Sequence, residues 1–165
     1  MTKLFLTLLL VTGLAHCGYA QTDSHVSLGV DAGIPVGAAG DNYSSAIGGS
    51  LKFESPACES VLFTVSLGYA SLAAKEALIG GGTFKPPAAI FTPLKFGLKY
   101  QLIGPLYTEG QIGAAFETRG RRSVRFIYAP GLVVSFGHID AGLRYEGWAG
   151  NGNISQVALR LGFRW

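Results

Sequence analysis

Apolar and polar residues alternate along the last twelve residues of the chain. The odd positions from Val157 to Trp165 are all apolar, whereas the even positions from Gln156 to Arg164 are polar, basic or small. A β-strand sends successive side chains to opposite faces, so segment 154–165 is predicted to be a strand with one apolar and one polar face. Such a strand suits a soluble sandwich, where the apolar face points into a core. It also suits a membrane barrel, where that face points to lipid and the charges point inward.

The same alternation occurs in seven further segments, and no long helical periodicity follows residue 22. Clusters of Gly, Pro, Asn, Asp or Ser separate these segments. The expected strands span 25–36, 44–55, 60–72, 91–103, 106–117, 125–136, 138–148 and 154–165. An even number of regularly spaced strands is typical of an up-and-down barrel or a sandwich.

The lengths of the connections favour the membrane barrel. Short turns at 56–59, 104–105 and 137–138 alternate with longer connections at 37–43, 72–90, 118–124 and 149–153. In an up-and-down barrel, the short turns and both termini then lie at one end and the longer loops at the other. Outer-membrane barrels have this asymmetry, with short periplasmic turns and longer extracellular loops. A Greek-key sandwich has no reason to produce it.

Charged residues within the strands fall on the polar faces, and their signs balance at six acids and six bases. This predicted interior charge network comprises Asp31, Lys52, Glu54, Lys95, Lys99, Glu109, Glu117, Asp140, Arg144, Glu146, Arg160 and Arg164. An eight-stranded barrel is narrow enough for side chains to fill it, and an unpaired charge inside would be costly. We therefore expect a filled interior, with Arg160 and Arg164 paired to acids of the first and seventh strands. A solvated polar face on a sandwich is the alternative.

Composition agrees with a membrane protein. Hydrophobic residues make up 48% of the chain and charged residues 14%, against roughly 25% charged residues in an ordinary soluble domain. Aromatic residues such as Phe91, Tyr100, Tyr145 and Trp148 lie near strand ends, where membrane barrels carry aromatic girdles; ordinary strand preference is the alternative. The net charge of +3 is too small to predict a nucleic-acid partner.

The N-terminus has the pattern of a secretory signal peptide. Lys3 precedes an uncharged apolar stretch at 4–15, and small residues precede a cleavage point after Ala20. We expect residues 1–20 to be the signal peptide and residues 21–165 to form the barrel domain. Cys17 raises the alternative of a lipoprotein, but His16 before it does not fit that processing pattern.

The whole mature chain resembles the small outer-membrane β-barrel proteins of Gram-negative bacteria. The resemblance is carried by the signal peptide and by segments 91–100, 107–116, 128–131, 143–147 and 155–165. It is similar to the outer membrane protein β-barrel domain of OmpX-, OmpW- and OmpA-type eight-stranded barrels. The resemblance implies an all-β, eight-stranded, antiparallel up-and-down transmembrane barrel in the cell outer membrane. Phe163 and Trp165 match the terminal aromatic signal read by the barrel-assembly machinery, although the family usually ends on Phe.

The sequence predicts no enzyme. A barrel enzyme acting on lipid A would need a His near a Ser at the outer rim. After the signal peptide, the chain contains only His25 and His138, both expected at the periplasmic end. No paired His or Cys has metal-binding spacing. We therefore expect no catalytic residues, no cofactor and no metal.

Two of the expected outer loops have unusual compositions. One carries the basic cluster Arg119, Arg121, Arg122 and Arg125, whose guanidinium groups suit the phosphates of lipopolysaccharide; a solvated loop is the alternative. The loop at 72–90 is apolar for an exposed segment. It is expected to fold over the barrel mouth, to form a short helix at 73–79, or to frame a hydrophobic entry site.

The predicted function is therefore that of an integral outer-membrane protein with a structural or surface-interaction role. We expect a monomer that contacts outer-membrane lipid and lipopolysaccharide and has a charge-filled interior rather than an open pore. The alternative is OmpW-like transport of small solutes or hydrophobic compounds.

Overall fold

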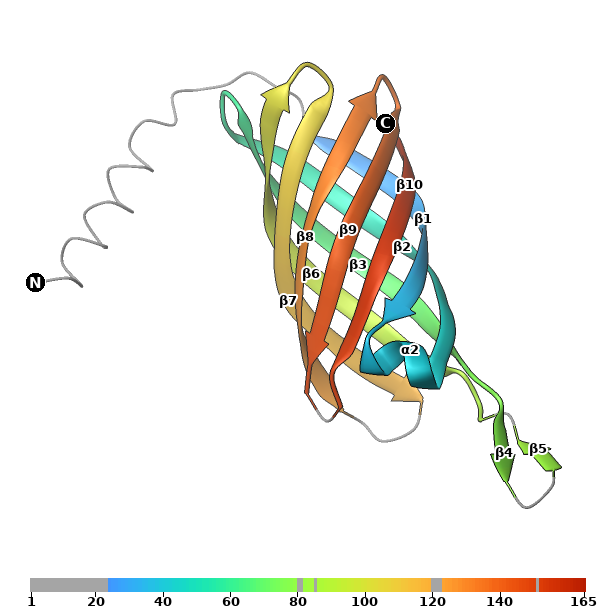
Figure 1. Ribbon diagram of the computed structural model, residues 1–165. Helices are drawn as coiled ribbons and strands as arrows, with labels where there is room; N and C mark the ends of the chain where they lie inside the picture. The colour runs from blue at the N-terminus through green and yellow to red at the C-terminus, as the bar shows by residue number, and fades with distance from the viewer. Residues whose placement is uncertain (1–23, 80–81, 85, 120–122, 151) are drawn as a thin grey trace, which may run out of the picture.

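A computed structural model describes residues 24–79, 82–84, 86–119, 123–150 and 152–165 as a closed antiparallel barrel of eight strands (Figure 1). The strands are β1 (His25–Val36), β2 (Tyr43–Cys58), β3 (Val61–Ala74), β6 (Ala89–Ile103), β7 (Leu106–Arg119), β8 (Val124–Phe136), β9 (Ile139–Ala149) and β10 (Ile154–Arg164). Each pairs with its neighbours in the chain, and β1 pairs with β10 to close the barrel. The predicted fold class is confirmed, with strand bounds that differ from the predicted ones by at most three residues. The expected signal peptide and the lipoprotein alternative at Cys17 lie outside the described residues.

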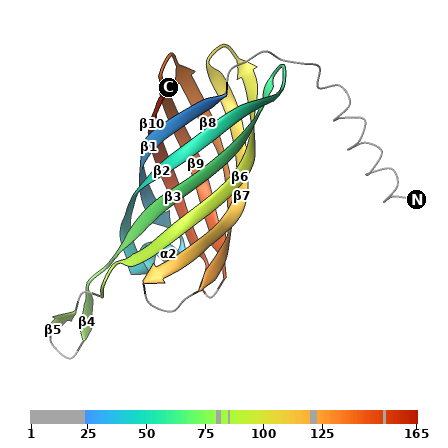
Figure 2. The same cartoon turned by 180° about the vertical axis from the view of Figure 1, so that it is seen from behind.

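The two ends of the barrel differ, as the alternating connection lengths predicted. The C-terminus, the start of β1 and the three short turns lie at one end, here called the turn end (Figure 1, Figure 2). The longer connections lie at the other, the loop end, with the helix α2 (Ala38–Asn42) and the strands β4 (Ala77–Ile79) and β5 (Gly82–Phe84). Among the described residues, no helix has the length and apolar character needed to cross a membrane.

The longest loop differs from the expected helix or lid. β3 continues to Ala74, and β4 then pairs with β5 in a separate two-stranded sheet that projects beyond the barrel (Figure 1, Figure 2). The helix expected at 73–79 is therefore wrong. A helix of seven residues gains too few hydrogen bonds to offset its nucleation, whereas β4 and β5 satisfy each other's backbone groups as paired strands.

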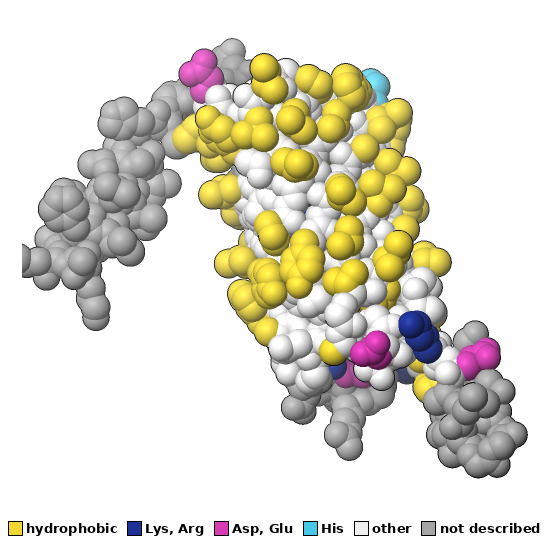
Figure 3. Space-filling model, in the orientation of Figure 1, with side chains coloured by type: hydrophobic (Ala, Val, Ile, Leu, Met, Phe, Trp, Pro, Cys, Tyr) yellow, Lys and Arg dark blue, Asp and Glu magenta, His cyan; other side chains and the backbone are white. Residues whose placement is uncertain are grey.

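The outer wall of the barrel is apolar. Hydrophobic side chains cover the wall in Figure 3, whereas charged side chains gather towards the loop end. On β10, for example, Val157, Leu159, Leu161 and Phe163 are all exposed. Monomeric soluble proteins rarely expose apolar patches beyond a few hundred Å². This surface therefore requires lipid around it, and the closed barrel leaves no unpaired strand edge in that lipid.

Candidate functional site in the barrel interior

The half of the lumen nearer the turn end holds five charged side chains, which we call the inner ion cluster. Lys52 Nζ lies 2.7 Å from Glu54 Oε1 and 3.4 Å from Glu109 Oε1. Lys99 Nζ lies 3.2 Å from Glu54 Oε1 and 3.7 Å from Asp140 Oδ2. All five side chains are buried. Each lysine is therefore shared between two acids, which offsets part of the cost of removing these charges from water.

A second group, the middle ion cluster, consists of Asp31, Lys95, Arg144 and Glu146. Glu146 Oε1 lies 2.7 Å from both Lys95 Nζ and Arg144 Nε. Arg144 Nη2 also lies 2.7 Å from Asp31 Oδ1. The second oxygen of Glu146 accepts hydrogen bonds from Gln156 Nε2 at 2.7 Å and from Trp148 Nε1 at 3.3 Å. Glu146 is therefore the hub of this cluster, with both oxygens satisfied.

Arg160 points into the lumen and is bound by hydroxyl groups of the neighbouring strands β1 and β2 rather than by the acids that we expected. Its Nε donates to Ser50 Oγ at 3.0 Å and its Nη2 to Ser27 Oγ at 3.0 Å. The guanidinium fits because Gly29 has no side chain: a Cβ there would lie 2.8 Å from Arg160 Cζ. The inward-facing glycine thus provides the space for a long charged side chain.

The structure gathers ten of the twelve side chains of the predicted charge network inside the barrel, five acidic and five basic. The other two lie at strand ends. Glu117 accepts a hydrogen bond from Ser123 Oγ at 2.5 Å at the loop end. Arg164 donates to the Gly137 carbonyl at 2.6 Å at the turn end. Both share the inward parity of their strands, but the strands extend past the filled part of the lumen at these positions.

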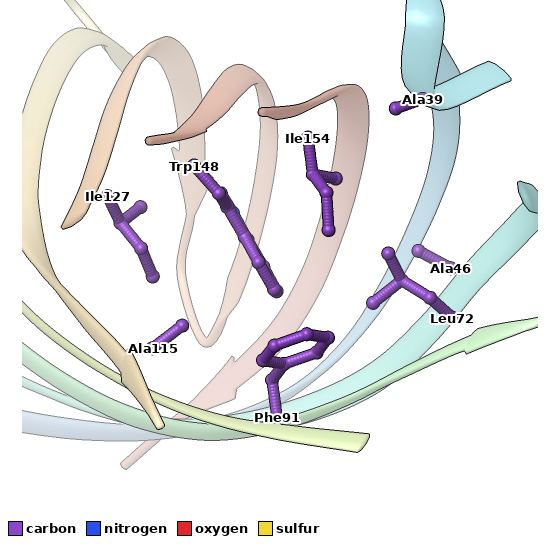
Figure 4. Close-up of a cluster of buried hydrophobic side chains, with 8 residues drawn as sticks. All are labelled: Ala39, Ala46, Leu72, Phe91, Ala115, Ile127, Trp148 and Ile154. Carbon is purple, nitrogen blue, oxygen red and sulfur yellow. The ribbon is translucent and has the colours of Figure 1, made fainter. Parts of the chain in front are cut away.

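Apolar side chains close the lumen at the loop end. This outer plug takes one residue from α2 and one from each strand of the barrel except β1 (Figure 4): Ala39, Ala46, Leu72, Phe91, Ala115, Ile127, Trp148 and Ile154. The rings of Phe91 and Trp148 meet edge to face, with centroids 5.0 Å apart. Each is 1% exposed. The interface-girdle prediction is therefore wrong for these two aromatics. Their parity was the available signal, since Phe91 lies on the same face of its strand as Lys95, and Trp148 on the same face as Glu146.

Arg125 lies inside the mouth and not on the loop surface where lipopolysaccharide contact was expected. Its side chain is buried, its guanidinium lies 5.5 Å from the Phe91 ring centroid, and it donates to the Gly152 carbonyl. Position 125 has the inward parity of β8, which explains its orientation. Arg119 is exposed at the end of β7, and Arg121 and Arg122 lie outside the described residues.

Two small cavities remain between these layers. The first has a volume of about 10 Å³ and is lined by Lys52, Glu109, Asp140 and Arg160, among others. The second has about 30 Å³ and is lined by residues that include Asp31, Lys95, Glu146 and Gln156. Both oxygens of Asp140 and Oε1 of Gln156 have no hydrogen-bond partner in the protein. Cavities of this size and polarity suit single water molecules.

Comparison with known proteins relates the fold to solved barrels. No protein-family model matches the chain, and no curated protein sequence matches it. The outer membrane protein Ail of Yersinia pestis, solved in a phospholipid bilayer nanodisc, is similar over 87% of this chain and 100% of that chain, with a TM-score of 0.61 and 14% identity. The N-terminal β-barrel domain of Pseudomonas aeruginosa OprF is similar over 86% and 97%, with a TM-score of 0.57 and 16% identity. A de novo designed transmembrane β-barrel is similar over 89% and 100%, with a TM-score of 0.56 and 12% identity.

The fold is that of an outer-membrane β-barrel. This agrees with the predicted resemblance and with the apolar outer wall, and the predicted outer-membrane location is confirmed. In such barrels the short turns are periplasmic and the longer loops extracellular. The outer plug therefore faces the cell exterior, and the inner ion cluster lies towards the periplasm.

The C-terminus of the outer-membrane barrel is fixed at the periplasmic end. The backbone of Trp165 exchanges hydrogen bonds with Val26 of β1, at 3.1 Å and 3.4 Å. The His138 ring stacks on Phe163, with centroids 5.7 Å apart, and its Nδ1 lies 3.0 Å from the Arg164 carbonyl oxygen. The aromatic rings of the predicted assembly signal, Phe163 and Trp165, are both exposed.

The histidines and the acidic side chains of the described structure were the candidates for a catalytic or metal centre. His25 lies at the start of β1 and His138 in the turn after β8, so both are at the periplasmic end. Within the described residues, no group of three or more His, Cys, Asp or Glu side chains is arranged to hold a metal ion.

Proposed function

We propose that the protein is a closed outer-membrane barrel whose role is structural or lies in contacts made by its extracellular end. The observation that carries this proposal is the filled lumen: two ion clusters and the outer plug leave cavities of only about 10 and 30 Å³. A hydrated ion or solute does not fit such spaces. The filled interior therefore favours a protein that acts as a rigid membrane anchor for its loops, rather than as a general pore.

Single-channel recording in planar lipid bilayers tests the closed state. The purified barrel should show no long-lived open state of porin size. Heat-modifiable migration on a denaturing gel should accompany the recording, because it verifies that the protein added to the bilayer is folded. A stable porin-sized conductance from folded protein would contradict the proposal.

Within this proposal, the extracellular end contacts anionic groups of lipopolysaccharide through Arg119, Arg121 and Arg122. Arginine binds phosphate through paired hydrogen bonds, and Arg119 is exposed at the extracellular end of β7. A crystal structure of Ail, with 15% identity and a TM-score of 0.56, is of a complex with the heparin analogue sucrose octasulfate. A polyanion is thus a ligand of a protein with this fold, which supports the proposal.

Lipopolysaccharide binding by variants tests this contact. Changing Arg119, Arg121 and Arg122 together to Gln should weaken binding of the detergent-solubilised barrel to purified lipopolysaccharide by about tenfold or more. Lys75→Gln is the control, because it removes an exposed positive charge at the same end but outside the cluster. Equal affinity of the triple variant and the wild type would refute the contact.

Two other roles have less support. Transport of small solutes or hydrophobic compounds, the alternative from the sequence, conflicts with a mouth filled by apolar side chains. A catalytic role lacks support because His25 and His138 lie at the periplasmic end, away from extracellular lipid A. We further propose that residues 1–20 are removed as a signal peptide, that the barrel is a monomer, and that Phe163 and Trp165 are read by the barrel-assembly machinery.

A further inference from the structure

We propose that the outer plug is a hydrophobic gate for small ions, with Trp148 as its moving part and Glu146 as its latch. This inference rests on the proposed closed barrel and adds a conditional activity to it. It starts from the contrast along the barrel axis. On the periplasmic side of the plug, charged and polar side chains fill most of the lumen, with smaller apolar contributions from Ala129, Val133 and Ala158. The eight plug residues are all apolar, and Arg125 is the charged side chain beside them.

The polar layers can accommodate an ion in a way that the plug cannot. The ion clusters consist of long, flexible Lys, Arg and Glu side chains beside two water-sized cavities. The oxygens of Asp140 and Gln156 that accept no hydrogen bond from the protein provide further sites for water. Such groups can replace part of the hydration shell of a passing ion. An apolar constriction has no polar groups to replace the hydration shell, so it blocks ions as long as it contains no water.

Trp148 is the residue on which the seal depends. It is the largest fully buried side chain in the described structure. It packs edge to face on Phe91 from the opposite side of the mouth (Figure 4). In the register of the sheet, Trp148 also pairs with Ile127 on one side and Ile154 on the other. Displacement of this one ring would therefore open the widest gap in the plug.

Contacts on both sides of the plug hold Trp148 in its closed position. On the periplasmic side, the indole Nε1 donates to Glu146 Oε2, at 3.3 Å. The other oxygen of that carboxylate lies in ion pairs with Lys95 and Arg144. On the extracellular side, Arg125 lies over the Phe91 ring. A change in the ion cluster at Glu146 would thus release the indole, which couples the polar lumen to the gate.

Single-channel recordings of four variants, in planar phospholipid bilayers with KCl on both sides, test the gate. Trp148→Ala and Phe91→Ala should each raise the probability of small-conductance openings at least about tenfold over wild type, because each removes half of the aromatic seal. Trp148→Phe keeps most of the bulk but loses the hydrogen bond to Glu146, and should give an intermediate increase. Phe126→Ala should behave as wild type: Phe126 pairs with Ala149, so it lies at the height of the plug, but it is exposed on the lipid face.

The outcomes separate the gate from the closed barrel. Heat-modifiable migration verifies that each variant is folded. If a folded Trp148→Ala, Phe91→Ala double variant opens no more often than wild type, the gate proposal is refuted and the closed-barrel proposal still stands. Porin-sized conductance of the wild type would instead overturn the closed barrel itself. Equal opening by Trp148→Phe and wild type would overturn the latch at Glu146.

Discussion

At the residue scale, Glu146 joins four donor groups in the middle ion cluster. Its two oxygens receive an ammonium, a guanidinium, an amide and an indole N–H. Among the described residues, the ion pair of Lys95 is with Glu146, at 2.7 Å.

Replacing Glu146 with Ala should therefore lower the free energy of unfolding by about 3–5 kcal/mol, because Lys95 would be left buried without its ion-pair partner, although Arg144 would keep Asp31. Equilibrium unfolding in urea, with the barrel reconstituted in lipid, measures the change. Glu117→Ala is the control, since Glu117 lies at the loop end with one hydrogen bond to Ser123, and it should cost much less. Equal losses for the two variants would show that burial of the hub has no special effect.

The inward-facing glycines make a second residue-scale prediction. At Gly29, a Cβ would lie 2.8 Å from Arg160 Cζ and 2.9 Å from the Leu161 carbonyl oxygen, whereas at Gly110 it would meet nothing within 4 Å. Gly29→Ala should therefore destabilise the barrel by about 1–3 kcal/mol through overpacking. Gly110→Ala, on the lipid face, should be close to neutral. Urea midpoints of the two variants would decide the point, and a neutral Gly29→Ala would mean that Arg160 has room to move.

At the element scale, the proposed assembly signal can be separated from the closure of the barrel. The backbone of β10 closes the barrel against β1, and Trp165 takes part in that closure through main-chain hydrogen bonds alone. The aromatic ring of Trp165 is exposed, as the proposed recognition during assembly requires.

Trp165→Ala should consequently lower the amount of folded barrel in the outer membrane of expressing cells while changing the urea midpoint of the purified barrel little. Quantifying the heat-modifiable form in outer-membrane fractions measures the first effect. Tyr145→Ala provides a control, because it removes an exposed aromatic from β9 and leaves the C-terminus intact. Unchanged yield from Trp165→Ala would argue against a role in assembly.

Elements were also the level at which the sequence was most informative. Alternation of period two located all eight barrel strands and the inward face of each, because lipid on one side and a packed lumen on the other leave little freedom of register. The outer loop at 72–90 was not predictable in this way. No burial pattern constrains a hairpin that pairs only with itself and projects from the barrel.

Which interior charges meet could not be predicted from the alternation. Arg144 binds Asp31 across 113 positions of the chain, and Lys52 contacts Glu109 across 57. Such contacts depend on the stagger of the strands and the width of the closed barrel, which only the assembled structure defines. The outer plug was missed for another reason: Phe91 and Trp148 were assigned by residue type to the interface, although their parity pointed inward.

On the scale of the whole molecule, the barrel consists of an apolar wall around a column of paired charges closed by an apolar plug. The column is balanced, with five acids and five bases among the predicted residues that lie inside. It is separated from the aqueous phase by lipid around the wall and by the plug at the outer mouth.

Dissolved salt therefore has little access to most of these ion pairs: the side chains of Lys52, Glu54 and Lys99 are at most 2% exposed, whereas those of Asp31 and Arg144 are 15% and 14% exposed. Surface ion pairs weaken as ionic strength rises, because mobile counterions screen them over about 8–10 Å at physiological salt. Counterions excluded from the lumen cannot do so. The unfolding free energy of the barrel should then stay nearly constant between low and high NaCl, whereas that of Trp148→Ala, with an opened mouth, should fall as NaCl is added. A bacterium whose surroundings change in osmotic strength would keep an envelope protein whose internal electrostatics do not change with the medium.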